Sequence, residues 1–140
     1  MGMTSASMLS RAVPLRVLYV DDDRVNSLLF VEICRLAGSI EVESAQCGAD
    51  ALELLDTWTP DLLVIDLHLP DTTGFELLPA LRLRADAPTL PAILCTADET
   101  ASVEQRAREV GFDACWTKPV ELQTVIGAMS TRRRLAGTVP

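Results

Sequence analysis

Apolar residues gather along the chain in short, nearly uninterrupted runs. The clearest are Leu15 to Val20, Leu62 to Ile65 and Ala92 to Thr96. Runs of this length without regular polar alternation are typical of strands that are buried on both faces of a sheet. Two weaker runs, Ile40 to Ala45 and Ala114 to Thr117, also favour strands. The hydrophobic pattern therefore predicts five strands.

Between these runs, apolar residues recur every three or four positions, which is the spacing of an amphipathic helix. Gly38 and Gly111 stand where helix C-caps are expected, and Pro60 and Pro91 each stand just before a strand. The helical positions form five groups: Val25, Leu28, Leu29, Ile33 and Leu36; Ala51, Leu54, Leu55 and Trp58; Phe75, Leu77, Leu78 and Leu81; Val103, Ala107 and Val110; Leu122, Val125, Ile126 and Met129. The predicted order is strand then helix, five times over.

This alternation predicts an α/β fold. Strands that alternate with helices imply right-handed crossovers and a parallel sheet covered on both faces, with ligands bound beyond the carboxyl ends of the strands. A length of 140 residues, 49% of them hydrophobic, suits one compact domain. We expect this domain over 15–130, with mobile ends at 1–14 and 131–140, the second carrying the basic run 132–134.

Charge and cysteine content narrow the function classes. All twenty acidic residues but only eight of the twelve basic ones lie between Leu15 and Ser130, a net charge of −12 that argues against a nucleic-acid partner. The four cysteines form no CxxC pair and are expected to be reduced, mostly buried thiols. Without a signal-peptide pattern or an apolar stretch of about eighteen residues, we expect a cytoplasmic protein with no membrane partner.

Acidic residues stand at the ends of two predicted strands. Asp21, Asp22 and Asp23 follow the first strand directly, and Asp66 ends the third, so the carboxylates are expected at one edge of the sheet. Such a cluster is repulsive unless a cation is present, and oxygen ligands without histidine or cysteine suit Mg²⁺. Strand-end aspartates can also simply cap the helices that follow, which we expect of Asp23.

Two further polar residues are predicted at the same edge. Lys118 is the only lysine in the chain and ends the fifth strand, and Thr96 ends the fourth. A carboxylate beside Mg²⁺ can act as a nucleophile toward a phosphoryl group, while an ammonium neutralises charge and a hydroxyl donates a hydrogen bond. The motifs GxSxG, GxxxxGK[ST] and GxGxxG are absent, so a serine hydrolase or the usual nucleotide loops are not indicated.

Four short motifs carry a family resemblance. They are LYVDDD at 18–23, DLHLP at 66–70 with Gly74 eight residues after Asp66, CTA at 95–97 and WTKP at 116–119. Together they resemble the receiver domain of two-component response regulators and hybrid histidine kinases, over about Leu15 to Met129, and HLP and WTKP look most like the hybrid-kinase type. The resemblance implies a flavodoxin-like, doubly wound (βα)5 fold with a five-stranded parallel sheet of order 2-1-3-4-5.

The same resemblance implies roles in phosphoryl transfer. Asp66 would accept a phosphoryl group from a phosphohistidine on a histidine kinase or a histidine phosphotransfer protein, and a downstream effector, not identified by the sequence, would receive the signal. Asp22 and Asp66 would bind Mg²⁺ directly, Asp21 through water, and His68 through its backbone carbonyl. We expect the His68 side chain to face solvent and to modulate the phosphoryl lifetime, in preference to the alternative that it binds the metal.

The remaining implied roles concern the switch. Lys118 would contact the Asp66 carboxylate and then the phosphoryl group, with a cis peptide before Pro119. Thr96 would swing toward the phosphoryl group and report its arrival. The position three before the lysine is usually aromatic in this family but is Cys115 here, which weakens the usual aromatic switch.

Two other functions remain open from the sequence. One is an interaction module on the same fold that works without phosphorylation, which the complete set of site residues argues against. The other is an aspartate-nucleophile phosphatase, which would want an acid where His68 stands. In the leading interpretation the chain catalyses only its own phosphorylation and dephosphorylation, and any kinase activity would belong to another part of a hybrid kinase.

Overall fold

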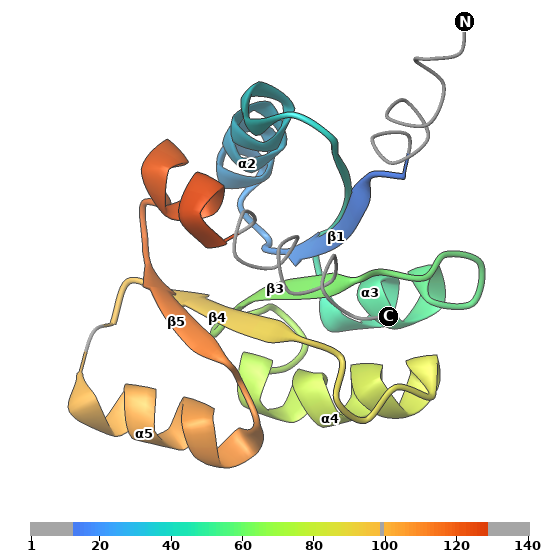
Figure 1. Cartoon of the computed structure of the whole chain (residues 1–140). Coiled ribbons are helices and arrows are strands. Elements are labelled where there is room, and N and C mark those ends of the chain that lie inside the picture. The colour runs from blue at the N-terminus through green and yellow to red at the C-terminus, as the bar shows by residue number, and fades with distance from the viewer. Residues whose placement is uncertain (1–12, 99, 129–140) are drawn as a thin grey trace, which may run out of the picture.

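Every predicted strand is present in the computed structural model, which describes residues 13–98 and 100–128 (Figure 1). The strands are β1 (Leu15–Val20), β2 (Ile40–Ala45), β3 (Leu62–Asp66), β4 (Ala92–Thr96) and β5 (Ala114–Thr117). Their bounds match the predicted runs, and β3 ends at Asp66, as predicted. The carboxylate of Asp66 therefore belongs to the last residue of a strand whose position is fixed by its neighbours.

Helices connect the strands, and polar caps fix where they begin. They are α2 (Arg24–Ala37), α3 (Gly48–Leu54), α4 (Gly74–Ala85) and α5 (Ala101–Val110), and residues 122–128 are helical as well. Asp23 caps α2 by accepting hydrogen bonds from two backbone amides, as expected for a strand-end aspartate. Gly38 and Gly111 stand at the C-caps of α2 and α5, as predicted.

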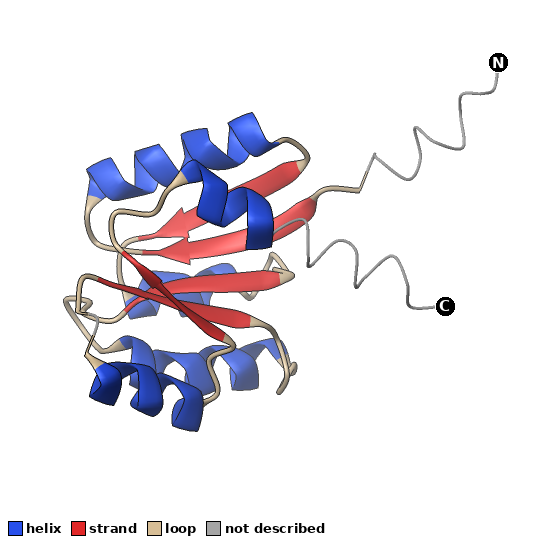
Figure 2. Ribbon diagram, turned by 60° about the vertical axis from the view of Figure 1, so that its left-hand side comes forward, coloured by secondary structure: helices blue, strands red, loops and turns tan. Residues whose placement is uncertain are grey.

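The five strands form one parallel sheet of order β2-β1-β3-β4-β5, which confirms the implied topology. Helix α2 and the helix at 122–128 cover one face of the sheet, and α3, α4 and α5 cover the other (Figure 2). Parallel strands place all their carboxyl ends at one edge, so the residues that follow β1, β3, β4 and β5 converge there.

Side chains alternate between the two faces and fill two separate cores. In β3, Leu63 and Ile65 join the core under α3 and α4, whereas Leu62 and Val64 join the core under α2. In β5 the same alternation sends Trp116 into the second core. All five residues of β3 are buried, which explains why the sequence run has no polar alternation.

The predicted apolar stripe of α2 locates this helix but not its buried face. The residues of α2 that are buried against the sheet are Ser27, Phe30 and Cys34. Val25, Leu28, Leu29 and Leu36 from the predicted stripe are instead 64%, 69%, 55% and 61% exposed. Helix α2 thus carries apolar residues on two sides, one of which faces solvent.

The second predicted helix ends earlier than its apolar spacing indicates. Helix α3 stops at Leu54, and Trp58 lies beyond it while still packing against the first core. The predictions of mobile ends at 1–14 and 131–140 fall almost wholly outside the described residues. Among the residues that are described, no helix combines the length and hydropathy needed to span a bilayer.

Candidate functional site

Three carboxylates meet at the carboxyl edge of the sheet, where the sequence places them. Asp21 and Asp22 follow β1 and Asp66 ends β3, and each offers an oxygen that lies within 4.8 Å of the others. Asp21 and Asp66 are buried, whereas Asp22 is exposed. We call these three residues the acid pocket. An all-oxygen donor set that is open on one side fits Mg²⁺, which binds few carboxylates and keeps several waters.

Lys118 supplies the positive charge of this site. Its ammonium Nζ lies 3.1 Å from Oδ2 of Asp21 and 3.2 Å from Oδ2 of Asp66, so one cation bridges the two buried carboxylates. Burial alone would lower the pKa of Lys118, but its hydrogen bond with Asp21 and the charges of both aspartates raise it. The lysine is therefore an ammonium ion at neutral pH. Its peptide bond to Pro119 is cis, as the resemblance implied.

Asp66 is buried and yet borders an opening to solvent. A concavity of about 480 Å³ is lined by Asp66 together with Asp22, His68, Thr96 and Lys118. Burial raises the pKa of the Asp66 carboxyl, the charge of Lys118 opposes this, and the charge of Asp21 adds to it. A small anion that enters the concavity can therefore reach the carboxylate and the ammonium together.

Asp21 is held by more donors than the sequence indicates. The hydroxyl of Tyr19 donates to Oδ2 of Asp21 at 2.9 Å, and the Asn26 amide nitrogen donates to the same oxygen at 3.3 Å. The backbone N–H of Asp23 donates to Oδ1 at 3.0 Å. Sequence reasoning missed Tyr19 and Asn26, although Tyr19 stands two residues before Asp21 and so shares its side of the strand.

A tight loop follows Asp66 and carries His68. The backbone carbonyl of Leu67 accepts a hydrogen bond from the backbone N–H of Gly74 at 2.8 Å. Within the loop that this bond closes, His68 pairs with Thr73 as an isolated antiparallel β-bridge. A Cβ on Gly74 would lie 2.8 Å from the carbonyl oxygen of Asp66, so only glycine lets α4 start this close to the strand end. The His68 side chain is exposed, as predicted.

The two residues assigned to the switch lie on neighbouring strands. Thr96 ends β4, is buried, and its hydroxyl oxygen accepts a hydrogen bond from the backbone N–H of Asp98 at 3.0 Å. Cys115 on β5 lies opposite Leu94 of β4, is partly buried and packs against the first core. Burial raises the pKa of the Cys115 thiol.

All four cysteines are free, as expected. Only Cys34 and Cys95 are buried, and Cys47 and Cys115 are partly exposed, so the thiols are less buried than predicted. Burial raises the pKa of Cys34 and of Cys95 to about 12, which keeps both protonated at neutral pH.

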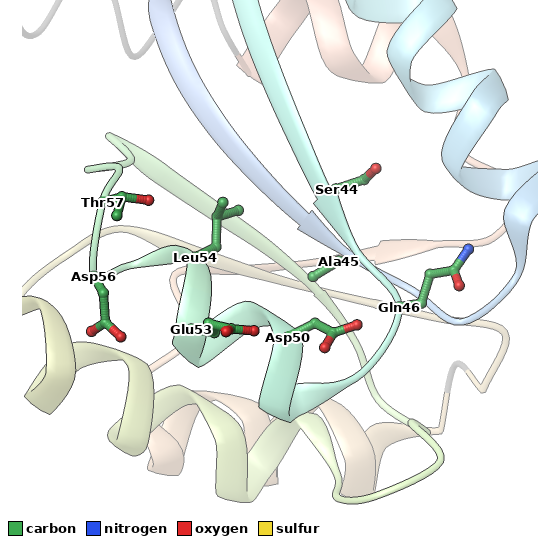
Figure 3. A pocket seen from close by; sticks show the side chains of 8 residues that line it. All are labelled: Ser44, Ala45, Gln46, Asp50, Glu53, Leu54, Asp56 and Thr57. Carbon is green, nitrogen blue, oxygen red and sulfur yellow. The ribbon is translucent and has the colours of Figure 1, made fainter.

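A second and larger concavity lies away from these residues (Figure 3). It has a volume of about 710 Å³ and is lined by Ser44 and Gln46 at the end of β2 and by Asp50, Glu53 and Asp56 in and after α3. No residue of the acid pocket lines it. No basic side chain of the described residues lines it, whereas the strand-end site combines carboxylates with Lys118, so the strand-end site is the better candidate for chemistry.

Comparison with known proteins gives the family. A family model described as the response regulator receiver domain matches residues 17–130. The chain is 30% identical over 114 residues to the polar-differentiation response regulator DivK of Brucella anthropi, a match that covers 81% of this chain and 92% of DivK. It is 33% identical over 111 residues to the sensor histidine kinase RcsC of Escherichia coli, covering 79% of this chain. That match spans only 11% of the kinase.

Solved structures agree with this result. The chemotaxis protein CheY4 of Vibrio cholerae superposes with a TM-score of 0.78 at 26% identity, covering 84% of this chain and 98% of that one. A putative response regulator from Chloroflexus aurantiacus gives a TM-score of 0.78 at 29% identity, with coverages of 86% and 98%. Since the family model matches most of the chain and DivK is matched over nearly its whole length, this chain belongs to the response regulator receiver domain family.

Proposed function

We propose that this protein is a phosphoacceptor of a two-component phosphorelay, with Asp66 as the residue that takes the phosphoryl group. The observation that carries the proposal is the bridging ammonium of Lys118 between the buried carboxylates of Asp66 and Asp21. This arrangement keeps a nucleophilic oxygen beside a fixed positive charge in an accessible concavity. The transfer of an anionic group to a carboxylate needs the nucleophilic oxygen and the positive charge together.

Magnesium is the proposed cofactor. Asp22 and Asp66 would bind it directly, Asp21 through a water molecule, and the backbone carbonyl of His68 would supply a further oxygen. When bound, the ion would neutralise charge on the phosphoryl oxygens. The many donors on Asp21 support its indirect role, because its oxygens are already engaged by Tyr19, Lys118 and Asp23.

In the proposed transfer, an oxygen of Asp66 attacks the phosphorus of a partner's phosphohistidine. The new bond is P–O, the bond that breaks is P–N, and the imidazole leaves with the electron pair and takes up a proton. Lys118 neutralises the phosphoryl oxygens as they approach. Hydrolysis of the resulting acyl phosphate returns Asp66 to a carboxylate and releases inorganic phosphate, which is the proposed autodephosphorylation.

The partner would be a histidine kinase or a histidine phosphotransfer protein, and helix α2 supports a place for it to dock. The exposed apolar residues of α2, Leu28 and Leu29 among them, begin a few residues after the acid pocket. A small cavity of about 30 Å³ joins Leu29 to Lys118 and Pro119. A partner that covers this face would bring its phosphohistidine to the edge where Asp66 lies.

Thr96 is the proposed reporter of phosphorylation. Its hydroxyl lies at the strand end beside Lys118 and could turn to donate a hydrogen bond to a phosphoryl oxygen. Cys115 provides no aromatic ring whose position could change behind Thr96. The change would therefore be carried by Thr96 and the loop that follows it, and would be passed to a downstream effector.

The test is phosphorylation by a small phosphodonor such as acetyl phosphate, followed by intact mass. With Mg²⁺ the wild-type protein should gain one phosphoryl group, and with EDTA it should gain none. Asp66→Asn should abolish the gain, while Asp86→Asn, a matched change at the far end of α4, should leave it intact. Labelling that persists in Asp66→Asn, or that ignores Mg²⁺, would refute the proposal. Absence of labelling in the wild type would favour a phosphorylation-independent interaction module.

A further inference from the structure

The loop at 67–74 is fastened at its tip to another element. The carboxylate of Asp71 accepts hydrogen bonds from the backbone amides of Gly48 at 2.8 Å and of Ala49 at 2.9 Å, more than twenty residues earlier. These amides open α3, where helical N–H groups have no partner within the helix. The two bonds hold the pKa of Asp71 below its usual range. Asp71 thus ties the loop after β3 to the helix after β2.

Gly48 makes this close approach possible. A Cβ at this position would lie 2.8 Å from Cγ2 of Thr72 and 3.4 Å from Oδ1 of Asp71. Real Cβ atoms do not tolerate the first of these distances, so the Thr72 side chain or the loop that carries it would have to shift. The backbone of Gly48 is helical and needs no glycine for its own conformation. Its small size therefore serves the contact with the loop.

The same loop presents the backbone of His68 to the acid pocket. His68 and Thr73 form a bridge that is flanked by hydrogen bonds from Gly74 to Leu67 and from Leu69 to Thr72. In such a non-hydrogen-bonded pair, the N–H and C=O groups of both residues point away from the opposite strand. The carbonyl of His68 is therefore free to face outward, and His68 lines the concavity over the acid pocket.

We propose that Asp71 is a positioning residue for the magnesium site. By clamping the loop tip to α3, it would hold the loop, and with it the carbonyl of His68 three residues away, in place to bind Mg²⁺. Mg²⁺ is demanding in this respect because it accepts only near-ideal octahedral geometry. Asp71 itself lies outside the acid pocket and binds no metal. The inference rests on the proposed function, since it assumes that Mg²⁺ binds there.

The experiment compares Mg²⁺ affinity, measured by titration calorimetry, in Asp71→Asn, Gly48→Ala and wild-type protein. Outer partners of a metal ligand typically change affinity by about 10- to 100-fold, and we expect a loss near tenfold in both variants. Asp71→Asn alters the acceptor on the loop, and Gly48→Ala alters the donor residue on α3. Because alanine has a higher helix propensity than glycine, Gly48→Ala should not weaken α3 itself. Asp86→Asn is the control, because it removes the same charge at an exposed position where asparagine suits the left-handed backbone.

Two further measurements separate positioning from general damage. The melting temperature in EDTA should fall by only a few degrees in Asp71→Asn, because the lost bonds cap one helix end and are partly or fully exposed. Amide exchange of Leu69 and Gly74 should quicken. Wild-type Mg²⁺ affinity in both variants would overturn the clamp while leaving the proposed function intact. An affinity loss in Asp86→Asn equal to that in Asp71→Asn would overturn it too, because net charge would then be the cause. A wild-type protein that binds no Mg²⁺ would refute the proposed function and the clamp with it.

Discussion

Asp21 illustrates how the contacts of one residue decide what its charge does to stability. From the sequence alone, three neighbouring carboxylates are expected to repel one another, so removal of the Asp21 charge should stabilise the metal-free protein. In the structure Asp21 is fully buried and receives hydrogen bonds from Tyr19 and Asn26 and an ion pair from Lys118. These contacts stabilise the Asp21 carboxylate in the folded protein and so argue for the opposite sign.

We therefore predict that Asp21→Asn destabilises the metal-free protein by about 2 kcal/mol, because an amide cannot accept all of these donors and leaves some unpaired. Asp22→Asn, at an exposed position of the same pocket, should change stability by less than about 0.5 kcal/mol or raise it. Urea unfolding in EDTA measures both. If Asp21→Asn proves at least as stable as wild type, repulsion outweighs the bonds.

The site residues that the sequence predicts are those at strand ends. Asp66, Thr96 and Lys118 could be identified because an apolar run ends at or before each of them, and parallel strands bring such ends together. Asn26 and Asp71 could not, because their roles depend on close approaches between elements that spacing along the chain does not reveal.

At the scale of elements, hydrophobic periodicity predicts that α2 is a helix but does not predict which of its faces is buried. Apolar spacing identifies a helix wherever one face is apolar, but a helix with two apolar sides leaves open which one meets the sheet. Phe30 decides the matter in the structure, since its ring stacks on Tyr19 of β1 with centroids 4.3 Å apart. The strands were more predictable, because burial on both faces leaves no side to choose.

This difference predicts unequal costs within one helix. Phe30→Ala should lower the free energy of unfolding by about 3 kcal/mol, since it empties a buried, stacked position. Leu28→Ala, two residues earlier in the same helix, should change it by less than about 0.5 kcal/mol, because Leu28 is 69% exposed. Thermal or urea unfolding distinguishes them. Equal losses in the two variants would mean that α2 is rotated relative to the structure described.

The segment after β4 is the element expected to respond to phosphorylation. With Cys115 in place of an aromatic residue, fewer contacts differ between the two states, and only such differences can shift their equilibrium. Amide exchange with and without beryllofluoride and Mg²⁺ should therefore change mainly at Thr96 and the start of α5. Strong changes throughout 112–128, with Cys115 becoming buried, would show that the switch operates without an aromatic ring.

At the scale of the whole molecule, net charge opposes the proposed chemistry and the site must overcome it. The chain carries a formal charge of −8, so an approaching phosphoryl group meets a net repulsive charge, which the ammonium of Lys118 opposes beside Asp66. This asymmetry explains why the proposed acceptor needs both the ammonium and a divalent cation.

The most direct test is to locate the phosphoryl group on the chain. After phosphorylation with acetyl phosphate and Mg²⁺, borohydride reduces an aspartyl phosphate to homoserine, and peptide mapping by mass spectrometry then identifies the altered residue. We predict homoserine at position 66 and nowhere else, with none formed in protein that was not phosphorylated. Homoserine at Asp21 or Asp22, or a phosphoryl group retained on a hydroxyl side chain while Asp66 is unchanged, would contradict Asp66 as the acceptor.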